Sequence, residues 1–358
     1  ITKKIITESD FLDFLHQKVL SAINIYESEA NWLENVTINS NEIGHSGDFW
    51  QDLIPLCIAY LSPASEFFKE DRLKNIIIER LEHGNQFLKI KRPRKNWWAW
   101  DIGIMRNVLK LLFLDLHAKI FGNENRRVLA EYVLYRGLHP VSMGFNTDLK
   151  KGMLNLKTGM NLLWVNFSLF QAGILFGKEK YVKTAAYNIN LIMKENRSWT
   201  GDGLAPDGSF HQHCFPKITG VNMGYGTSFL ETGSIYLWIV GSVQNSSEIH
   251  RGGNSIGINK KSNMSDFDYL QVPELTLKSF LKLVKFVVWN SWAGNMNFWT
   301  KGRALSRYHK KHRIGDYVDV LDHTRALLFT PFISFKEILI EAIKQRKKSK
   351  NQTHYPYP

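Results

Sequence analysis

The chain has 358 residues, and its 46 Lys and Arg against 33 Asp and Glu give a formal net charge of +13 at pH 7 with histidine neutral. With 44% hydrophobic and 13% aromatic residues, it can bury a large core, which excludes a wholly disordered protein. Its two cysteines, Cys57 and Cys214, exclude a disulfide framework and a four-cysteine zinc module.

Apolar residues recur at spacings of three and four along most of the chain, which predicts helices. We expect them at residues 9–29, 48–62, 71–90, 101–121, 124–139, 158–176, 178–195, 226–243, 274–290 and 322–345. No alternating stretch is long enough to define a sheet, so the predicted fold class is all-α. Successive helices with short joints indicate an antiparallel array of helical hairpins, either a solenoid or an α/α toroid.

The uncharged stretch at residues 158–177 approaches the ~20 residues that a bilayer span needs. We predict a buried helix and no transmembrane segment, because four polar residues interrupt the stretch: Asn161, Asn166, Ser168 and Gln171. The first ten residues carry no apolar signal core and do not begin with Met, which indicates a processed chain or a piece of a longer one.

The positive charge is concentrated in three runs, at residues 89–95, 301–313 and 344–350, which hold sixteen cations and no acid. Without them, 30 basic residues would face 33 acidic ones. A local excess of this kind is expected where stretches of chain face a polyanion. The alternative is a set of solvated loops and, for residues 344–358, a disordered tail. No recognised DNA- or RNA-binding motif accompanies the runs, so nucleic acid is not expected as a partner.

Two stretches break the helical pattern. Residues 196–226 carry six glycines and two prolines together with histidine and tyrosine. A long irregular loop on a helical frame is a frequent place for function. Residues 244–272 are polar and rich in Gly, Asn and Ser, which is typical of an exposed insertion.

An aromatic cluster follows the first basic run and comprises Asn96, Trp97, Trp98, Trp100 and Asp101. Indole rings flanked by cations suit sugars, because the apolar faces of sugar rings stack on indole while the cations meet carboxylates or sulfates. The alternative is a packing cluster at the start of a helix, capped by Asp101.

Two further motifs are candidates for binding a carboxylate. Asn161 lies in the run Thr-Gly-Met-Asn that opens an apolar helix, where its amide and the positive end of the helix dipole favour an anion. Arg303 and Arg307 are four residues apart and would share one face of a helical turn, which suits bidentate binding. An ordinary first-turn asparagine and a surface arginine pair are the alternatives.

The irregular loop supplies the run Asp-Gly-Ser-Phe-His-Gln-His, which ends at His213, and then Tyr225 between two glycines. A histidine and a tyrosine on a glycine-rich scaffold are a plausible acid–base pair. His211 and His213 could instead bind zinc, with His309 or His312 as third ligand. A hydrogen-bonded structural histidine is the remaining alternative.

These motifs follow one another in the order NWW-x-W/Y-[DE]-IG, TG-x-N, DGS-[FY]-x-x-H … YG and GR-x-[IL]-S-R, from about residue 96 to residue 307. The order resembles polysaccharide lyase family 8, which contains the hyaluronate, chondroitin AC and xanthan lyases. The resemblance implies an incomplete α/α toroid over residues 1–343, with residues 244–272 as an insertion. In the family, antiparallel β-sheet domains follow the toroid, and we expect them to be absent from this chain.

Carried over position by position, the resemblance implies a site for β-elimination at a uronic acid. Asn161 matches the asparagine that engages the uronate carboxylate. His213 and Tyr225 match the catalytic histidine and tyrosine. Arg303 and Arg307 match the arginine pair of the family. Asn96, Trp97 and Trp98 match the aromatic patch that directs the polymer, and we add Trp100 to this patch. The resemblance implies neither a metal nor another cofactor.

The partner implied is an anionic polysaccharide, chondroitin or hyaluronan. The location implied is extracellular or a virion envelope, because the Lys-, Asn- and Ile-rich composition is similar to that of a baculovirus envelope member of the family. Two alternatives stay open. One is a catalytically impaired glycosaminoglycan-binding protein, because an acid from the β region helps to orient the catalytic groups in the family. The other is an α/α-toroid glycoside hydrolase, which needs two carboxylates from among Asp101, Asp202 and Asp207.

Overall fold

The computed structural model of the protein describes residues 8–28, 45–89, 98–137, 145–148, 153–156, 158–195, 201–212, 223–252, 269–289, 291–292 and 295–296, together with residues 337 and 340. These residues are mostly helical, so the predicted all-α class is confirmed. They fall into two compact units. Unit 1 comprises Ile1–Ser142 and Ile174–Lys178, and unit 2 comprises Met143–Gly173 and Glu179–Pro358. Apart from residues 337 and 340, the predicted helix at 322–345 lies outside the described residues.

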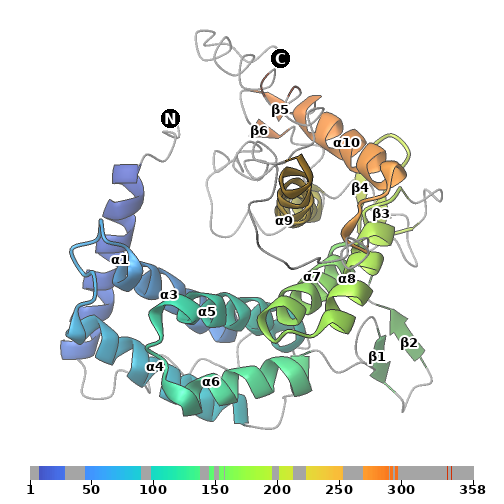
Figure 1. Ribbon diagram of the computed structural model, residues 1–358. Coiled ribbons are helices and arrows are strands. Elements are labelled where there is room, and N and C mark those ends of the chain that lie inside the picture. Colours follow the sequence, from blue (N-terminus) through green and yellow to red (C-terminus); the bar gives the residue numbers. More distant parts are fainter. Residues whose placement is uncertain are drawn as a thin grey trace, which may run out of the picture. The chain divides into compact units, whose positions relative to one another are not determined.

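Unit 1 is an assembly of helices around α3. Its elements are α1 (Glu8–Ser28), α3 (His45–Leu61), α4 (Asp71–Lys89), the π-helix η2 (Ala99–Gly103), α5 (Ile104–Ala118), α6 (Gly122–Glu131) and the π-helix η3 (Tyr132–Gly137). Figure 1 labels the α-helices among them. α3 contacts α1, α4 and α5. Trp50, Leu53 and Leu56 lie at spacings of three on one face of α3 and are at most 1% exposed. These side chains form the centre of the unit 1 core.

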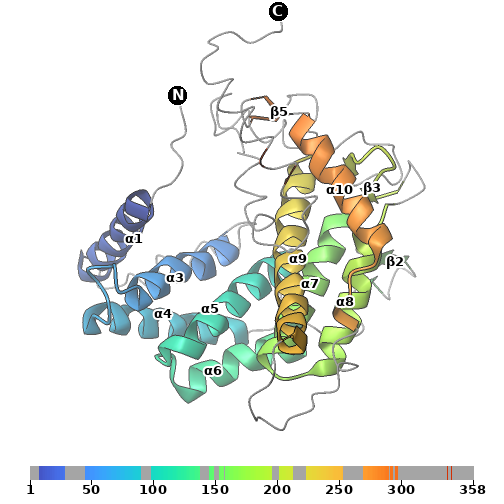
Figure 2. The same cartoon turned by 45° about the horizontal axis from the view of Figure 1, so that its top comes forward.

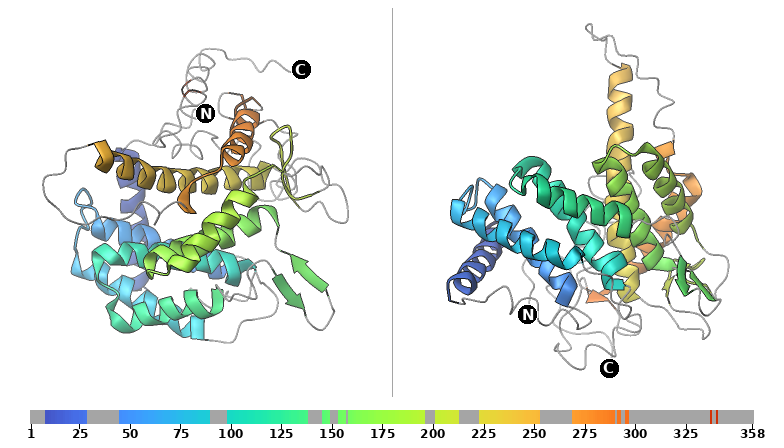
Figure 3. Two further views of the ribbon diagram at one scale, coloured as in Figure 1. Left: turned by 45° about the vertical axis from the view of Figure 1, so that its right-hand side comes forward. Right: turned by 90° about the horizontal axis from the view of Figure 1, so that it is seen from below.

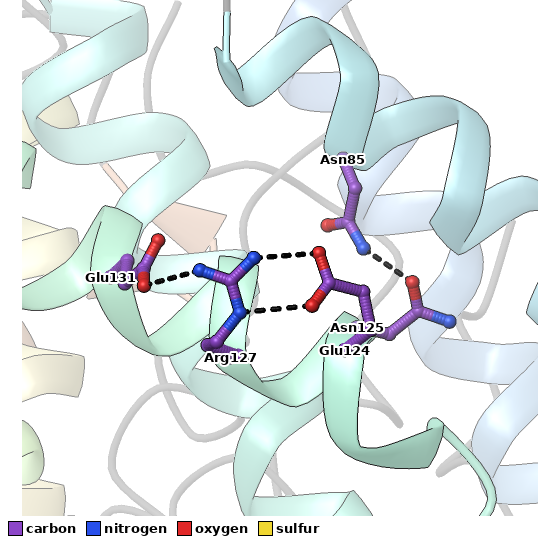
Figure 4. A network of polar contacts seen from close by, with 5 residues as sticks. All are labelled: Asn85, Glu124, Asn125, Arg127 and Glu131. Atoms are coloured by element: carbon purple, nitrogen blue, oxygen red, sulfur yellow. Dashed lines mark hydrogen bonds and ion pairs between the residues drawn. The ribbon is translucent and has the colours of Figure 1, made fainter.

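α4 packs closely on α3 and is also linked to α6. A Cβ atom on Gly84 would lie 2.6 Å from the Trp50 ring, so the backbone of α4 approaches α3 without a side chain between them. On the α6 side, the buried Asn85 donates from Nδ2 to Oδ1 of the buried Asn125 at 2.6 Å (Figure 4). A direct bond between two buried amides fixes how α4 and α6 are aligned.

The turn between α5 and α6 is organised by a buried carboxylate. Asp115 is 2% exposed, and its Oδ1 accepts hydrogen bonds from the backbone N–H of Ile120 at 2.9 Å and of Phe121 at 3.0 Å. Arg126 donates from Nε to the other oxygen of the same carboxylate. Lys119 takes the left-handed conformation at φ 53°, which ends α5. A buried charge is tolerated here because it is paired and hydrogen-bonded.

Two π-helical turns replace ends of the predicted α-helices. η2 precedes α5, and η3 continues α6 where the sequence predicts one uninterrupted helix over residues 124–139. The two π-helices contact each other, and the hydroxyl of Tyr132 donates to the backbone carbonyl of Trp100. Wider π turns are often found next to functional residues, and η2 follows the exposed Trp98 directly.

Unit 2 contains four α-helices and three short two-stranded ladders among its described residues. The helices are α7 (Gly159–Leu175, the last two residues of which belong to unit 1), α8 (Glu179–Ile192), α9 (Met223–Gly252) and α10 (Glu274–Trp289), labelled in Figure 2. α7 is buried on most of its surface, as the sequence predicts for this apolar stretch. None of the helices in the described ranges combines the length and apolarity needed to cross a bilayer.

The ladders are antiparallel hairpins that the sequence pattern did not reveal. β1 (Phe145–Asp148) pairs with β2 (Met153–Leu156), β3 (Gly203–Leu204) with β4 (Phe210–His211), and β5 (Ser291–Trp292) with β6 (Asn295–Met296). Figure 3 shows β1 and β2 as a hairpin of their own. Strands of two to four residues are too short for a two-residue alternation to stand out, which explains why they were not predicted.

Aromatic side chains connect the helices of unit 2. Phe229 of α9 lies between Phe210 of β4 and Phe280 of α10, with ring centroids 4.8 Å and 6.5 Å away. Phe170 of α7 meets Tyr236 of α9 edge to face at 5.3 Å. All five rings are at most 1% exposed. This aromatic core fixes α7, α9, α10 and the β3–β4 hairpin to one another.

The limits of α9 correct two predictions. The helix begins at Met223, three residues before the predicted start, so Tyr225 lies in its first turn and not in the preceding loop. It ends at Gly252, nine residues after the predicted end at 243. The first part of the predicted insertion at residues 244–272 is therefore helical. Its Gln, Asn, Ser and Glu residues lack the apolar periodicity that predicts a helix, but each costs a helix no more than about 0.7 kcal/mol.

Candidate active site

The candidate active site is built at the start of α7. Gly159 opens the helix with a left-handed φ of +52°, and Asn161 follows in the first turn. Asn161 is 7% exposed, and its Oδ1 atom is buried without a hydrogen-bond partner among the described residues. A buried polar atom left in this way costs about 1–3 kcal/mol. Because Oδ1 is an acceptor, a bound molecule could satisfy it only with a donor such as a hydroxyl, whereas the Nδ2 group is the donor available to a carboxylate.

Gln212 holds the start of α7 from a distant part of the chain. Its Oε1 accepts a hydrogen bond from the backbone N–H of Met160 at 2.8 Å, and its Nε2 donates to Oδ2 of Asp202 at 2.7 Å. Nε2 also lies 3.3 Å from the backbone carbonyl of Thr158, and the Thr158 hydroxyl donates to Asp202. We call Gln212, Asp202 and Thr158 the amide clamp.

The motif Asp-Gly-Ser forms a turn next to this clamp. Oδ1 of Asp207 accepts from the backbone N–H of Ser209 at 2.9 Å and from its hydroxyl at 2.7 Å, and the same hydroxyl lies 2.9 Å from Nε2 of His211. Gly208 has a φ of +87°, and a Cβ atom there would lie 2.4 Å from the backbone carbonyl of Lys282. His211 is 8% exposed. These contacts give the motif a structural role, which is to pack the β3–β4 hairpin against α10.

Tyr225 lies near Trp164, a residue of α7. Its ring centroid lies 6.4 Å from that of Trp164, at an interplanar angle of 56°. Trp164 is one turn after Asn161 on α7, and residues three apart share a helix face. Tyr225 is half-buried in the first turn of α9. The structure therefore brings the first turn of α9 close to Trp164, in the second turn of α7.

The aromatic patch predicted in unit 1 is described in part. Trp98 is 39% exposed, and its ring would lie 3.1 Å from a Cβ atom on Gly103. Trp100 is 5% exposed, and its backbone carbonyl accepts the Tyr132 hydroxyl. Burial favours a packing role for the Trp100 ring and leaves Trp98 as the described tryptophan of the patch that a sugar could reach.

Five of the predicted site residues lie outside the described ranges: Asn96, Trp97, His213, Arg303 and Arg307. The same holds for His309 and His312 of the zinc alternative, and the described ranges contain no group of three His, Cys, Asp or Glu side chains that could hold a metal ion. Of the acids considered for a hydrolase, Asp202 and Asp207 each accept two hydrogen bonds from neighbouring side-chain or backbone groups. That bonding favours structural roles for both.

Sequence reasoning missed Gln212 and Trp164 as site residues. Gln212 lies between His211 and His213, the two residues of this motif that the sequence suggests for acid–base chemistry or zinc binding. No signal in the sequence identifies it, because its partner Met160 is 52 residues away along the chain. Nothing in the sequence distinguishes Trp164 from the other apolar residues of its helix.

Comparison with known proteins identifies the family of this chain. The model of "Polysaccharide lyase family 8, N terminal alpha-helical domain" matches residues 12–247. Two proteins of Enterococcus faecalis are similar in sequence. "Polysaccharide lyase 8 family protein HylA" is 24% identical over 49% of this chain and 12% of its own length, and "Hyaluronate lyase HylB" is 27% identical over 46% of this chain and 17% of its own length.

The fold is also that of a solved lyase. The chondroitin AC lyase of Streptomyces coelicolor A3, in complex with chondroitin sulphate, aligns with 97% of this chain and 50% of its own, at a TM-score of 0.59 and 14% identity. The chain thus spans half of that structure and a smaller part of each E. faecalis protein. The family match extends over more than half of the chain, from the core of unit 1 through the first turns of α7 and α9. This chain belongs to polysaccharide lyase family 8, of which it carries the N-terminal α-helical domain.

Proposed function

We propose that this chain is a polysaccharide lyase that cleaves a uronic-acid-containing glycosaminoglycan by β-elimination. The observation that carries the proposal is that the ring of Tyr225, in the first turn of α9, lies 6.4 Å from the ring of Trp164, which is three residues after Asn161 on α7. Asn161 offers the N–H groups of its amide to a carboxylate, while its buried Oδ1, which has no partner among the described residues, could accept from a sugar hydroxyl. A carboxylate-binding amide and a proton-transferring phenol are two groups that this reaction would use.

Asn161 would bind the carboxylate of the uronic acid. The proton on C5 becomes acidic only when the negative charge that develops on the neighbouring carboxylate is stabilised. Amide N–H groups placed at that carboxylate act on the charge as it develops, and removal of one such donor typically costs about 100- to 1,000-fold in kcat. The positive end of the α7 dipole acts in the same direction.

Tyr225 and His213 would move the protons. A base takes the C5 proton, the electron pair forms the C4–C5 double bond, and the C4–O4 bond breaks. O4 leaves with the preceding sugar and takes a proton, which we assign to Tyr225, while the base is His213 or Tyr225. Arg303 and Arg307 would supply positive charge to this step. Asn96, Trp97 and Trp98 would hold the polymer, and the buried ring of Trp100 would support them.

Chondroitin or hyaluronan is the proposed substrate. Members of the family with similar sequence or fold include a hyaluronate lyase and a chondroitin AC lyase. The net charge of +13 suits a polyanion of either kind. Extracellular or virion-envelope location stays a prediction from the sequence.

The test is ultraviolet absorbance over time with chondroitin and hyaluronan in separate reactions. We expect a rising signal from the conjugated double bond of the unsaturated uronate, and the two rates rank the substrates. New reducing ends without that absorbance would show a hydrolase and contradict the proposal. A flat trace with polymer still bound at low salt would indicate that the domain binds the polymer without cleaving it.

A further inference from the structure

Gln212 supplies the N-terminal cap of α7 from 52 residues further along the chain. The first N–H groups of a helix have no partner within the helix, and a side chain just before the helix usually accepts from them. Thr158 stands at that position, but its hydroxyl donates to Asp202 instead. The Met160 N–H is satisfied by Oε1 of Gln212 at 2.8 Å. The first turn of α7 is therefore held in place by a tertiary contact.

Asp202 fixes which way the Gln212 amide faces. A carboxylate only accepts hydrogen bonds, so the NH₂ group must point to Asp202, 2.7 Å away, and the carbonyl oxygen to Met160. The reversed amide would place its oxygen against the carboxylate and its N–H groups against the Met160 N–H. Gln212 is 1% exposed, so water has little access to its amide. The charge of Asp202 thus selects a single arrangement.

We propose that Gln212 is a positioning residue that sets the place of Asn161, a proposal that rests on the function proposed above. Met160, which Gln212 binds, is the residue directly before Asn161. A shift of the first turn moves the Asn161 amide relative to the uronate carboxylate, and a misplacement of about 1 Å can cost ~100-fold in rate. Gln212 is also the residue directly before His213 in the sequence. One hydrogen bond therefore joins the residue before Asn161 to the residue that precedes His213 in the sequence.

The test exchanges the donor and the acceptor of the hydrogen bond between Gln212 and Asp202, in the full 358-residue chain. Gln212→Glu places a second carboxylate against Asp202, which drives the side chain away from Met160. In Gln212→Glu with Asp202→Asn, the new Asn donates to the new Glu, and the pair keeps its single negative charge. Gln271→Glu is the control for added charge, because Gln271 is exposed in the segment before α10.

We expect Gln212→Glu to lower kcat about 100-fold with a much smaller change in KM, and the double variant to recover to within about tenfold of the wild type. Gln271→Glu should match the wild type. A purely structural role predicts another pattern, in which the fraction of folded protein falls while kcat per folded molecule stays constant. That pattern, or a double variant as slow as Gln212→Glu, overturns the proposal.

A second measurement does not depend on turnover. Hydrogen exchange of the Met160 amide should be at least about tenfold faster in Gln212→Glu and slow again in the double variant. Should the wild-type chain form no unsaturated product, the proposed function fails, and affinity for a chondroitin oligosaccharide replaces kcat. Loss of exchange protection and of affinity in Gln212→Glu, with both restored in the double variant, supports the positioning role. Unchanged exchange and affinity in Gln212→Glu contradicts it.

Discussion

Gly159 and Gln212 approach so closely that a side chain on residue 159 is excluded: a Cβ atom there would lie 2.3 Å from Oε1 of Gln212. Gly159 also has a φ of +52°, where any other residue loses roughly 1–2 kcal/mol. The glycine of the Thr-Gly-x-Asn motif is thus required both by its backbone conformation and by the amide clamp.

The variant Gly159→Ala tests the contact. We expect it to lower the free energy of unfolding by about 2–4 kcal/mol, which combines the cost of the left-handed conformation with that of the clash. Gly177→Ala is the matched control, because Gly177 has a φ of +62° and a Cβ atom there would meet nothing within 4 Å. Urea unfolding of both variants separates the two costs, and equal losses would show that the Gln212 contact is unimportant.

Tyr225→Phe tests the proposed proton transfer. The hydroxyl is removed and the ring that packs near Trp164 is kept, so polymer binding should be spared while turnover falls about 100- to 10,000-fold. Tyr236→Phe is the control on the same helix, since that ring is buried against Phe170 in the core. The measurements are the initial rate of absorbance increase and the affinity for the polymer, for both variants and the wild type. Wild-type turnover in Tyr225→Phe would refute the assigned role.

Asn161 and Asn166 are buried on the same helix but differ in their hydrogen bonding. Asn166 donates to the Leu162 carbonyl at 2.9 Å and accepts from Asn188 at 2.8 Å, whereas Oδ1 of Asn161 has no partner in the described part of the chain. Asn166→Ala should therefore cost about 1–3 kcal/mol of stability, and Asn161→Ala less than about 1 kcal/mol.

The same pair should show the opposite order in activity. We expect Asn161→Ala to lower turnover about 100- to 1,000-fold, and Asn166→Ala to keep the wild-type rate per folded molecule. Chemical unfolding and initial rates on both variants give the comparison. If Asn161→Ala proved the more destabilising of the two, Asn161 would be a structural asparagine.

In unit 1, α6 carries an exposed ion-pair cluster and one member of a buried amide pair (Figure 4). Asn125 is 8% exposed and accepts from Asn85 of α4, whereas Arg127 is 54% exposed and pairs with Glu124 and Glu131 within its own helix. Asn125→Ala should cost about 1–3 kcal/mol, because it leaves a buried donor unsatisfied.

Arg127→Ala should be indistinguishable from the wild type in urea unfolding, although it removes more contacts. Hydrogen bonds to the two glutamates raise the pKa of the Arg127 guanidinium, but it is charged at working pH in either case. Water and salt screen exposed pairs of this kind. A larger loss for Arg127→Ala than for Asn125→Ala would contradict this ordering.

Cys57 is a free thiol in the core of unit 1, at 1% exposure. Burial, and after it the negative charge of Asp115, raise the pKa of the thiol well above its usual value. Because the thiolate is the reactive form, we expect no labelling by a thiol reagent at pH 8 until the protein is unfolded in urea. A Cys214→Ser background isolates the signal, and labelling of the native protein would show that this part of the core opens.

The sequence by itself determined the helical class, the approximate span of nine helices within the described ranges and the order of the motifs. Helical periodicity is a local property, because residues three and four apart share a face whatever the helix packs against. The motif order predicted family 8, and the family match over residues 12–247 confirmed it. The candidate residues Asn161 and Tyr225 came from the same motifs, and the assigned roles of all the site residues stay predictions.

Only the tertiary structure decided which of these residues meet. Trp100 and Trp98 look equivalent in the sequence, yet one ring is buried and the other is 39% exposed. The capping of α7 by Gln212 joins residues 52 apart, and no local pattern encodes a partner at that distance. The physical reason is that burial and long-range hydrogen bonds depend on how helices pack, whereas periodicity and propensity depend on neighbours along the chain.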